Sequence, residues 1–349
     1  MEILSFIFGN FAANFLVMAD LEEKVFNIQN DADFERIALE IFEFQSVNNH
    51  IYKKYLEFLG KRRIGTVDSL KKIPFMPVEF FKFFNVKTTD FEPETFFASS
   101  GTTGQNVSKH YIKKLAIYYK SLICGFEKFY GNVQNYKILA LLPSYLERGN
   151  SSLVLMTEKL MELSGNGADG FYLYDFEGLE RKIDEILSSQ PSKKILLIGV
   201  TFALLDYAEK LRKNYGSRLI IMETGGMKGR KKELVREEVH GILCDRLGVP
   251  SVHSEYGMTE LLSQAYSSGG GIYRETDTMR VLIRNSSDPF EYVQDGVTGG
   301  VNVADLANIY SCAFVQTQDL GVKLPCGGFK ILGRFDAAET RGCSLMYAG

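Results

Sequence analysis

The middle of the chain alternates short apolar runs with segments of helical periodicity. The apolar runs lie at residues 136–143, 193–200, 218–224 and 250–257, with a shorter one at 171–174. The helical segments between them cover residues 151–163, 179–187, 201–213 and 233–247. This alternation predicts an α/β protein with a parallel sheet built from β-α-β units. Ligands bind at the strand ends of such sheets, so the residues that follow each run are the first candidates for a site.

The two ends of the chain have other patterns. Residues 31–60 predict one helix, because their apolar side chains recur at helical spacing, Asp31 or Asp33 can cap the start, and Gly60 can end it. Residues 73–84, IPFMPVEFFKFF, combine two prolines with aromatic residues and predict a buried connection. Beyond about residue 271 the helical pattern stops. Short β-like segments follow at residues 278–285, 299–306, 312–319 and 328–335.

These patterns predict a division of the chain. We expect an α/β region over residues 18–270, a β-rich subdomain over residues 271–332, and a hinge-like motif with a tail over residues 333–349. Residues 3–17 resemble the apolar part of a signal peptide, but Glu2 stands where a basic region is expected. A secretion signal and a structural N-terminal segment are alternatives. We favour a dispensable extension upstream of a natural start at Met18.

Composition excludes broad classes of protein. A net charge of −3 and a pI near 6.0 give no support to a nucleic-acid binder that relies on bulk basic charge. No uninterrupted apolar run reaches the roughly 18 residues of a membrane span, so we expect no stable membrane insertion. The five cysteines are odd in number and far apart, which favours a reducing compartment and a cytoplasmic location.

Residues 97–109, FASSGTTGQNVSK, form a candidate phosphate loop between a possible strand at 94–98 and a helix expected over 110–129. Its glycines let the backbone turn tightly, and successive N–H groups can form an anion nest. The spacing is that of neither a Walker A loop nor a dinucleotide-binding loop. A polar surface turn is the alternative. The candidate phosphate contacts are Ser99, Ser100, Gly101, Thr102, Thr103, Gly104 and Lys109.

Further polar residues follow the predicted strands. Glu260, in YGMTE, can hold Mg²⁺, a cation that prefers carboxylate and phosphate oxygens. Thr259 beside it can hydrogen-bond a phosphate. The bare glycine backbone of ETGG can lie against an adenine, and Asp319 can accept hydrogen bonds from ribose hydroxyls. The candidate adenine and ribose contacts are Gly225, Gly226, Tyr256, Gly257, Asp319 and Arg334.

These motifs, in this order, resemble the acyl-adenylate-forming superfamily, which includes acyl-CoA synthetases, luciferases and peptide-synthetase adenylation domains. The motifs are SSGTTG, the GG loop, YGMTE, the TQD of Asp319, and GRFD followed by RG. The resemblance implies the large N-terminal domain of that fold. It also implies binding of ATP and Mg²⁺, and attack of a carboxylate on the α-phosphate to give acyl-AMP and pyrophosphate. Typical members continue past GRxD as a mobile lid with a catalytic lysine, and we expect that lid to be absent here.

Residues 18–343 are similar to one branch of this superfamily, the LuxE-type acyl-protein synthetases. The segments VFNI, IFEFQSVNNHIYKKY, IPFMPVEFFK and RGC carry the similarity. It implies activation of a long-chain fatty acid, transfer of the acyl group to a cysteine that matches Cys343, and delivery to an acyl reductase partner. A thiolate is a suitable nucleophile, and Arg341 would favour the thiolate form of Cys343. An incidental tail cysteine is the alternative.

The resemblance places the acyl pocket at residues 198–211, IGVTFALLDYAEKL, for which an ordinary core helix is the competing account. We expect the pocket to be lined by Gly199, Val200, Phe202 and Met258. His253 is expected to line the site, whereas Cys124 and Cys244 are expected to be packing residues. A metal site at His240 and Cys244 has little support.

Two other functions remain open from the sequence. One is a short acyl- or aryl-CoA ligase that resembles phenylacetate-CoA ligase. The other is a non-catalytic, nucleotide-binding scaffold subunit of a reductase complex.

Overall fold

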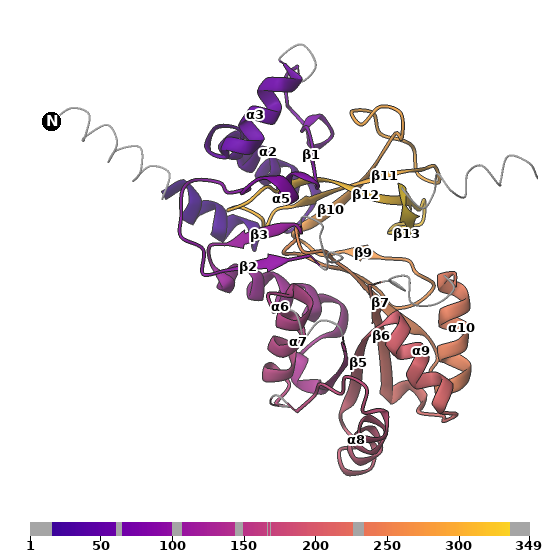
Figure 1. Cartoon of the computed structure of the whole chain (residues 1–349). Helices are drawn as coiled ribbons and strands as arrows, with labels where there is room; N and C mark the ends of the chain where they lie inside the picture. The colour runs from indigo at the N-terminus through magenta and orange to yellow at the C-terminus, as the bar shows by residue number, and fades with distance from the viewer. Residues whose placement is uncertain are drawn as a thin grey trace, which may run out of the picture.

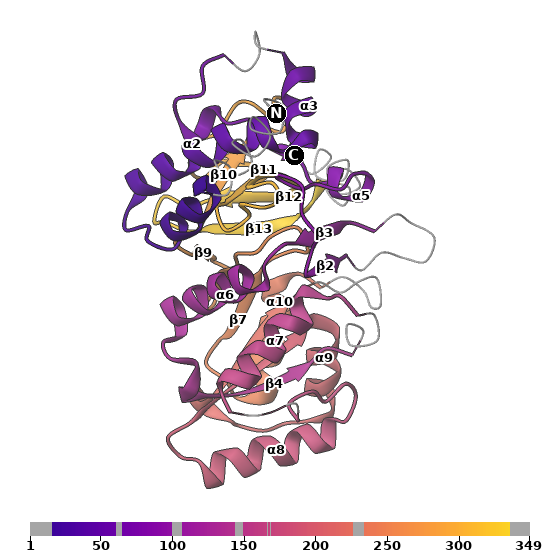
Figure 2. The same ribbon diagram turned by 90° about the vertical axis from the view of Figure 1, so that its left-hand side faces the viewer.

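The computed structural model describes residues 16–60, 65–99, 107–143, 149–165, 167, 169–225 and 234–335. Two sheets, each covered by its own helices, make up the two parts of the molecule (Figures 1 and 2). None of the helices within these ranges is long and apolar enough to cross a membrane. Several of the candidate nucleotide-binding residues, among them Tyr256 and Asp319, lie where the two parts meet.

One part is a six-stranded sheet with the order β4-β5-β6-β7-β8-β9. Its strands are β4 (Tyr136–Leu141), β5 (Lys194–Val200), β6 (Leu219–Thr224), β7 (Val252–Tyr256), β8 (Ala265–Ser267) and β9 (Arg274–Glu275). The first four strands are parallel and the last two antiparallel, which confirms the parallel sheet expected from the sequence. The apolar runs are buried on both faces, as is typical of parallel strands.

Helices cover both faces of this sheet. They are α6 (Leu115–Tyr130), α7 (Ser152–Leu163), α8 (Phe176–Ser189), α9 (Thr201–Lys210) and α10 (Arg236–Leu247). Figure 1 shows α6 and α7 on one side of the strands and α9 and α10 on the other. The carboxyl ends of β6 and β7 face the second part of the molecule, because side chains there contact residues of its sheet, directly or through Arg236.

The other part is a five-stranded sheet with the order β1-β12-β11-β10, in which β13 also pairs with β12. Its strands are β1 (Met76–Pro77), β10 (Met279–Arg284), β11 (Thr298–Asp305), β12 (Phe314–Lys323) and β13 (Phe329–Arg334). The β-rich pattern expected beyond residue 271 is confirmed. The N-terminal residues cover this sheet as a helix over residues 16–25, α2 (Asp31–Asn48), α3 (His50–Leu59) and α5 (Phe80–Phe83). The described part of the chain also contains three 3₁₀ turns, η1 (Leu70–Lys72), η2 (Val133–Asn135) and η4 (Gly216–Arg218).

The single helix expected over residues 31–60 is wrong, because Asn49 divides it. The Asn49 side-chain oxygen accepts hydrogen bonds from the backbone N–H groups of Ile51 and Tyr52 and caps α3. Its amide donates to the carbonyl of Ser311, 2.8 Å away. Asparagine favours such local bonds over a helix interior. The first helix also begins differently, since its cap is Asn30 and not an aspartate.

The start of the helix expected over residues 110–129 is also wrong. Residues 109–112 form β3 (Lys109–Ile112), which pairs antiparallel with β2 (Thr95–Ala98), and the helix begins only at Leu115. The run at residues 171–174 makes a single bridge, from Phe171 to Ala140, and no strand. Cys124 is exposed on α6, so its expected packing role is wrong as well.

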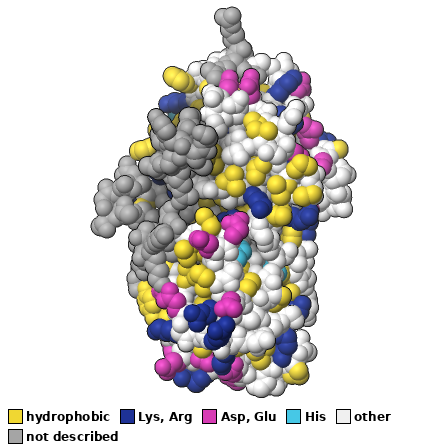
Figure 3. Space-filling view, turned by 90° about the vertical axis from the view of Figure 1, so that its right-hand side faces the viewer, with side chains coloured by type: hydrophobic (Ala, Val, Ile, Leu, Met, Phe, Trp, Pro, Cys, Tyr) yellow, Lys and Arg dark blue, Asp and Glu magenta, His cyan; other side chains and the backbone are white. Residues whose placement is uncertain are grey.

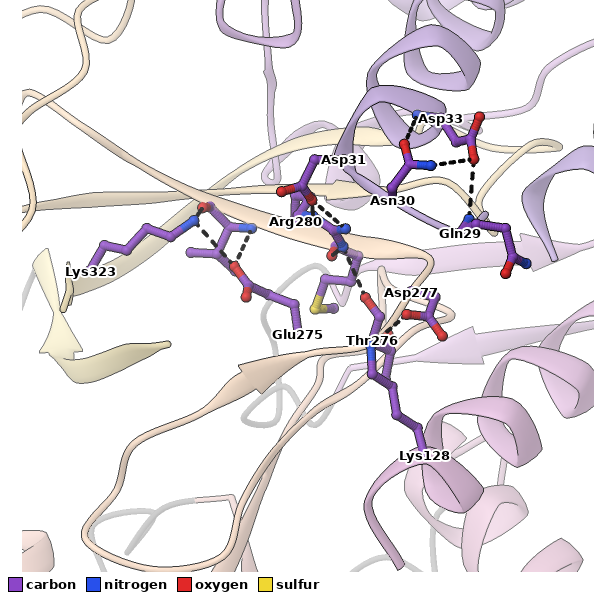
Figure 4. Close-up of polar contacts among 12 residues, drawn as sticks. Gln29, Asn30, Asp31, Asp33, Lys128, Glu275, Thr276, Asp277, Arg280 and Lys323 are labelled. Carbon is purple, nitrogen blue, oxygen red and sulfur yellow. Dashed lines mark hydrogen bonds and ion pairs between the residues drawn. The ribbon is translucent and has the colours of Figure 1, made fainter. Parts of the chain in front are cut away.

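Ion pairs fix the segment that joins the two sheets. Residues 274–280 lead from β9 to β10, and Figure 4 shows this segment held from three directions. Glu275 pairs with Lys323 of β12 at 3.4 Å, Asp277 pairs with Lys128 of α6, and Arg280 pairs with Asp31 of α2 at 2.8 Å. The connection between the sheets is thus tied to both parts of the molecule.

Candidate functional site

Three polar side chains from distant segments meet at the carboxyl end of β7. The hydroxyl of Tyr256 donates a hydrogen bond of 2.8 Å to Oδ2 of Asp319 on β12. Arg334 on β13 is the strand partner of Asp319, and its Nε lies 3.9 Å from Oδ1. Burial raises the pKa of Asp319, and the Tyr256 hydrogen bond and the charge of Arg334 act in the opposite direction. The Asp319 carboxylate is thus a half-buried acceptor that lies between a donor and a cation.

Glu260 lies in the turn after β7 and is only 6 % exposed. Burial raises the pKa of its carboxyl, while a hydrogen bond from Ser108 and the charges of Lys82 and Arg334 lower it. The Glu260 main-chain carbonyl accepts a 2.8 Å hydrogen bond from Asn308. No group of three or more His, Cys, Asp or Glu side chains that could hold a metal ion occurs among the residues described. A carboxylate such as that of Glu260 is one of the oxygen ligands that Mg²⁺ takes beside phosphate and water oxygens.

His110 was not singled out from the sequence, yet it supports this turn. Its Nδ1 donates a 2.9 Å hydrogen bond to the carbonyl of Thr259, the residue before Glu260. Burial lowers the pKa of His110 to about 4, so the ring is neutral at pH 7. The sequence offered no signal for this contact, because β3 lies about 150 residues from Thr259 in the chain.

A second buried carboxylate, also missed, lies at the end of β6. Oε1 of Glu223 accepts a 2.7 Å hydrogen bond from Thr201, and Oε2 lies 3.3 Å from Nε2 of His240 and 3.9 Å from Nε of Arg236. Burial alone would raise the pKa of Glu223, but these partners bring it below its usual value. Arg236 also donates to the carbonyl of Ile331 on β13 at 3.3 Å. The network therefore links the strand before Gly225 to the strand that carries Arg334.

Glu255 is a third buried carboxyl near the same edge. Its Oε2 accepts a 2.6 Å hydrogen bond from Thr224, and Oε1 lies against Gly257 so closely that a Cβ there would stand 2.4 Å away. Its neighbour across the strands is Tyr266, whose hydroxyl has no hydrogen-bond partner in the described part of the chain. Burial raises the pKa of Glu255 to about 7. The position before Tyr256 gave no hint of this in the sequence.

The structure also describes Ser99, Lys109, Gly225 and His253, which were expected at the site. Ser99 accepts a hydrogen bond from the N–H of Ser108, and Lys109 is exposed with its ammonium 5.8 Å from the Phe96 ring centre. Gly225 adopts a φ of +73°, which favours glycine. His253 lies near the amino end of β7, 3.1 Å from the Tyr130 hydroxyl.

The expected acyl-pocket residues lie around the junction of β5 and α9 and the turn after β7. Val200 and Phe202 are buried, and Met258 is half-buried. Gly199 is packed against Leu204, since a Cβ at Gly199 would meet that side chain at 2.6 Å. The remaining candidates lie outside the described residues: Ser100, Gly101, Thr102, Thr103, Gly104, Gly226, Arg341 and Cys343.

Figure 3 shows the face of the molecule on which α10 lies. Acidic and basic side chains are interspersed over its described surface, and no continuous basic band crosses that part of it.

Comparison with known proteins identifies the family and the fold. A family model described as "Acyl-protein synthetase, LuxE" matches residues 27–348, which confirms the resemblance inferred from the motifs. No curated protein matches the sequence. Among solved structures, ATP-bound MatB from Rhodopseudomonas palustris is similar, with a TM-score of 0.53, 15 % identity, and coverage of 71 % of this chain and 50 % of that one.

A second solved structure gives the same result. O-succinylbenzoate coenzyme A synthetase (MenE) from Bacillus subtilis, in complex with ATP and magnesium ion, has a TM-score of 0.51 and 16 % identity. The alignment covers 71 % of this chain and 53 % of MenE. The chain thus spans about half the length of these structures and shares the fold of that half.

Proposed function

The chain belongs to the LuxE acyl-protein synthetase family, and from this premise we propose that it activates a long-chain fatty acid with ATP and Mg²⁺. The product of that step is acyl-AMP. The acyl group then passes to Cys343 and from there to an acyl reductase partner. The observation that carries the proposal is that Arg334 lies beside Asp319 and that its charge also acts on the buried carboxyl of Glu260.

The residues of this site divide the work of the first step. Asp319, held by Tyr256, accepts hydrogen bonds from the ribose hydroxyls, and Glu260 holds Mg²⁺. Mg²⁺, when bound, draws negative charge from the phosphate oxygens. A bond forms between the fatty-acid carboxylate oxygen and the α-phosphorus, and the bond to the departing pyrophosphate breaks. Both relatives named above were solved with ATP, which supports this use of the fold.

The second step needs a nucleophile. The thiolate of Cys343 attacks the acyl carbonyl, a carbon–sulfur bond forms, and AMP leaves with the electron pair. Adenylation makes this possible, because a free carboxylate is a poor electrophile and AMP is a good leaving group. Arg341 favours the thiolate form.

Pyrophosphate exchange tests the proposal. Wild-type protein with ATP, Mg²⁺ and a long-chain fatty acid should exchange labelled pyrophosphate into ATP without coenzyme A. Glu260→Gln should lower the exchange rate by about 10²-fold or more, since it removes the charge that faces Mg²⁺. Asp319→Ala should raise the ATP concentration needed for half-maximal exchange. Glu177→Gln, on the exposed face of α8, is the matched control and should behave as wild type.

The acceptor decides between this proposal and its alternatives. Free acyl-CoA as the main product would favour a CoA ligase. Binding of ATP without exchange, even with the reductase present, would favour a nucleotide-binding scaffold.

A further inference from the structure

The short helix α5 is connected through His110 of β3 to the turn that carries Glu260. Phe81 of α5 is buried, and its ring lies edge-on to the ring of His110, with the centroids 5.6 Å apart. His110 in turn donates its hydrogen bond to Thr259, directly before Glu260. Lys82 is the next residue of α5. The contact of Phe81 with His110 and the hydrogen bond of His110 to Thr259 therefore connect its helix to the turn that carries Glu260.

A second set of contacts ties the start of α5 to the other side of the site. The carboxylate of Glu79 accepts a hydrogen bond from the amide of Gln318 on β12. The amide oxygen of Gln318 accepts a 2.8 Å hydrogen bond from Arg334 on β13. Lys82 and Arg334 thus come from elements that are linked through Gln318. They are also the two basic residues whose charges lower the pKa of Glu260.

Lys82 differs from Lys72 and Lys87, two other lysines in this stretch of the chain. Lys72 and Lys87 pair with Asp68 and Asp90, at 2.8 Å and 3.4 Å. The ammonium of Lys82 is exposed and forms no hydrogen bond or ion pair with any residue that the structure describes. A cation within electrostatic reach of a buried carboxylate, but not paired with it, is suited to an anion that approaches from solvent.

We propose that Lys82 is a catalytic residue of the adenylation step, which binds a phosphate oxygen of ATP beside Glu260 and stabilises the departing pyrophosphate. This inference rests on the proposed function. As the α-phosphorus bonds to the fatty-acid oxygen, the electron pair of the breaking P–O bond goes to pyrophosphate. Lys82 compensates the charge that builds up there, and it neither gains nor loses a proton.

The test compares Lys82→Met with a lysine variant away from the site. Lys82→Met should reduce the maximal rate of pyrophosphate exchange by about 10²-fold, the size of effect seen when one charge-stabilising donor is removed. Lys82→Arg keeps the charge and should recover a large part of the rate. Lys54→Met, an exposed lysine on α3, should keep the wild-type rate. Lys82→Met should also melt within a few degrees of wild type, because the side chain is exposed.

The outcomes separate this inference from the proposed function. Exchange by Lys82→Met within about threefold of wild type, at saturating ATP, would overturn the role of Lys82. Failure of the wild-type protein to exchange would instead contradict the proposed function. In that case, calorimetric titration of ATP and Mg²⁺ still tests whether Lys82 binds a phosphate of ATP. Equal affinity in wild type and Lys82→Met would overturn phosphate binding by this residue.

Discussion

The hydroxyl of Tyr256 donates a hydrogen bond to the carboxylate of Asp319 across the two sheets, with an oxygen–oxygen distance of 2.8 Å. Tyr256 ends β7 of the six-stranded sheet, and Asp319 lies within β12 of the five-stranded sheet. This hydrogen bond is one of the contacts that join the two parts of the molecule, and it lies at the position we assign to the ribose.

Removal of the hydroxyl should therefore weaken ATP binding. In Tyr256→Phe, the half-buried carboxyl of Asp319 loses its donor, and its pKa rises further above the usual range. A hydrogen bond to a charged group contributes about 1.5–3 kcal/mol, which corresponds to roughly 10- to 100-fold in affinity. Calorimetric titration of ATP and Mg²⁺ measures this. Tyr174→Phe, at an exposed tyrosine, is the control, and equal affinity in both variants would remove the assigned role.

Glu255 should make the stability of the protein depend on pH. Burial raises its pKa in the folded protein to about 7, from an ordinary value of 4.5. The folded state therefore holds the proton more tightly, and the stabilisation is fully present below about pH 4.5 and is lost as pH rises through 7. The free energy of unfolding should fall by up to about 1.4 kcal/mol per pH unit within this window. Urea unfolding at pH 5, 6, 7 and 8 measures it.

Two variants identify the carboxyl responsible. Glu255→Gln should abolish this part of the slope, because the amide does not titrate. Thr224→Val removes the hydrogen bond that lowers the pKa of Glu255 and should move the loss of stability to higher pH. An unchanged slope in Glu255→Gln would show that another group titrates.

Cys343→Ser should separate the two chemical steps. The variant should still exchange pyrophosphate, because no residue of the ATP site has changed. It should not accumulate a hydroxylamine-labile acyl group, which intact-mass analysis detects after incubation with ATP and a fatty acid. Cys124→Ser is the matched control, since Cys124 is an exposed cysteine on α6. An acyl adduct that persists in Cys343→Ser would contradict the assignment.

Phe314→Ala should destabilise the five-stranded sheet. Phe314 is fully buried on β12, and its ring lies within 6.4 Å of the rings of Phe42, Tyr52 and Phe75. Loss of a buried phenylalanine costs about 3–5 kcal/mol, which urea unfolding would show as a lower midpoint. Phe58→Ala, at a side chain that is 90 % exposed, should change stability by no more than about 0.5 kcal/mol.

The sequence predicted well the elements whose pattern is local. The runs that became β4, β5, β6 and β7 are buried on both faces, so their apolar character needs no knowledge of their partners. The hairpin β2–β3 was missed because Lys109–Ile112 is a strand only through its pairing with Thr95–Ala98. Asn49 was missed for a similar reason, since part of its bonding goes to Ser311.

In the candidate site, too, residues whose roles depend on distant partners could not be predicted from the sequence. Glu260, Asp319 and Arg334 stand in recognisable motifs, and the structure brings their segments together. His110 and Glu255 stand in no motif, and Glu223 stands beside the glycines of ETGG but was not itself singled out. Their roles depend on burial and on partners from other segments, such as the carbonyl of Thr259 for His110. The resemblance also reached residues 100–104 and Cys343, which lie outside the described ranges and remain predictions.

The pairing of β1 with β12 has a consequence for synthesis of the chain. Met76 pairs with Val315, and Gln45 of α2 donates to the carbonyls of residues 308, 309 and 311. At roughly 5–20 residues per second, the ribosome needs on the order of 10–50 s to make the chain between Met76 and Val315. During that interval the apolar faces of α2 and α3 have emerged but their partner strand has not. A nascent chain stalled before β12 would therefore expose these faces and be a substrate for chaperones.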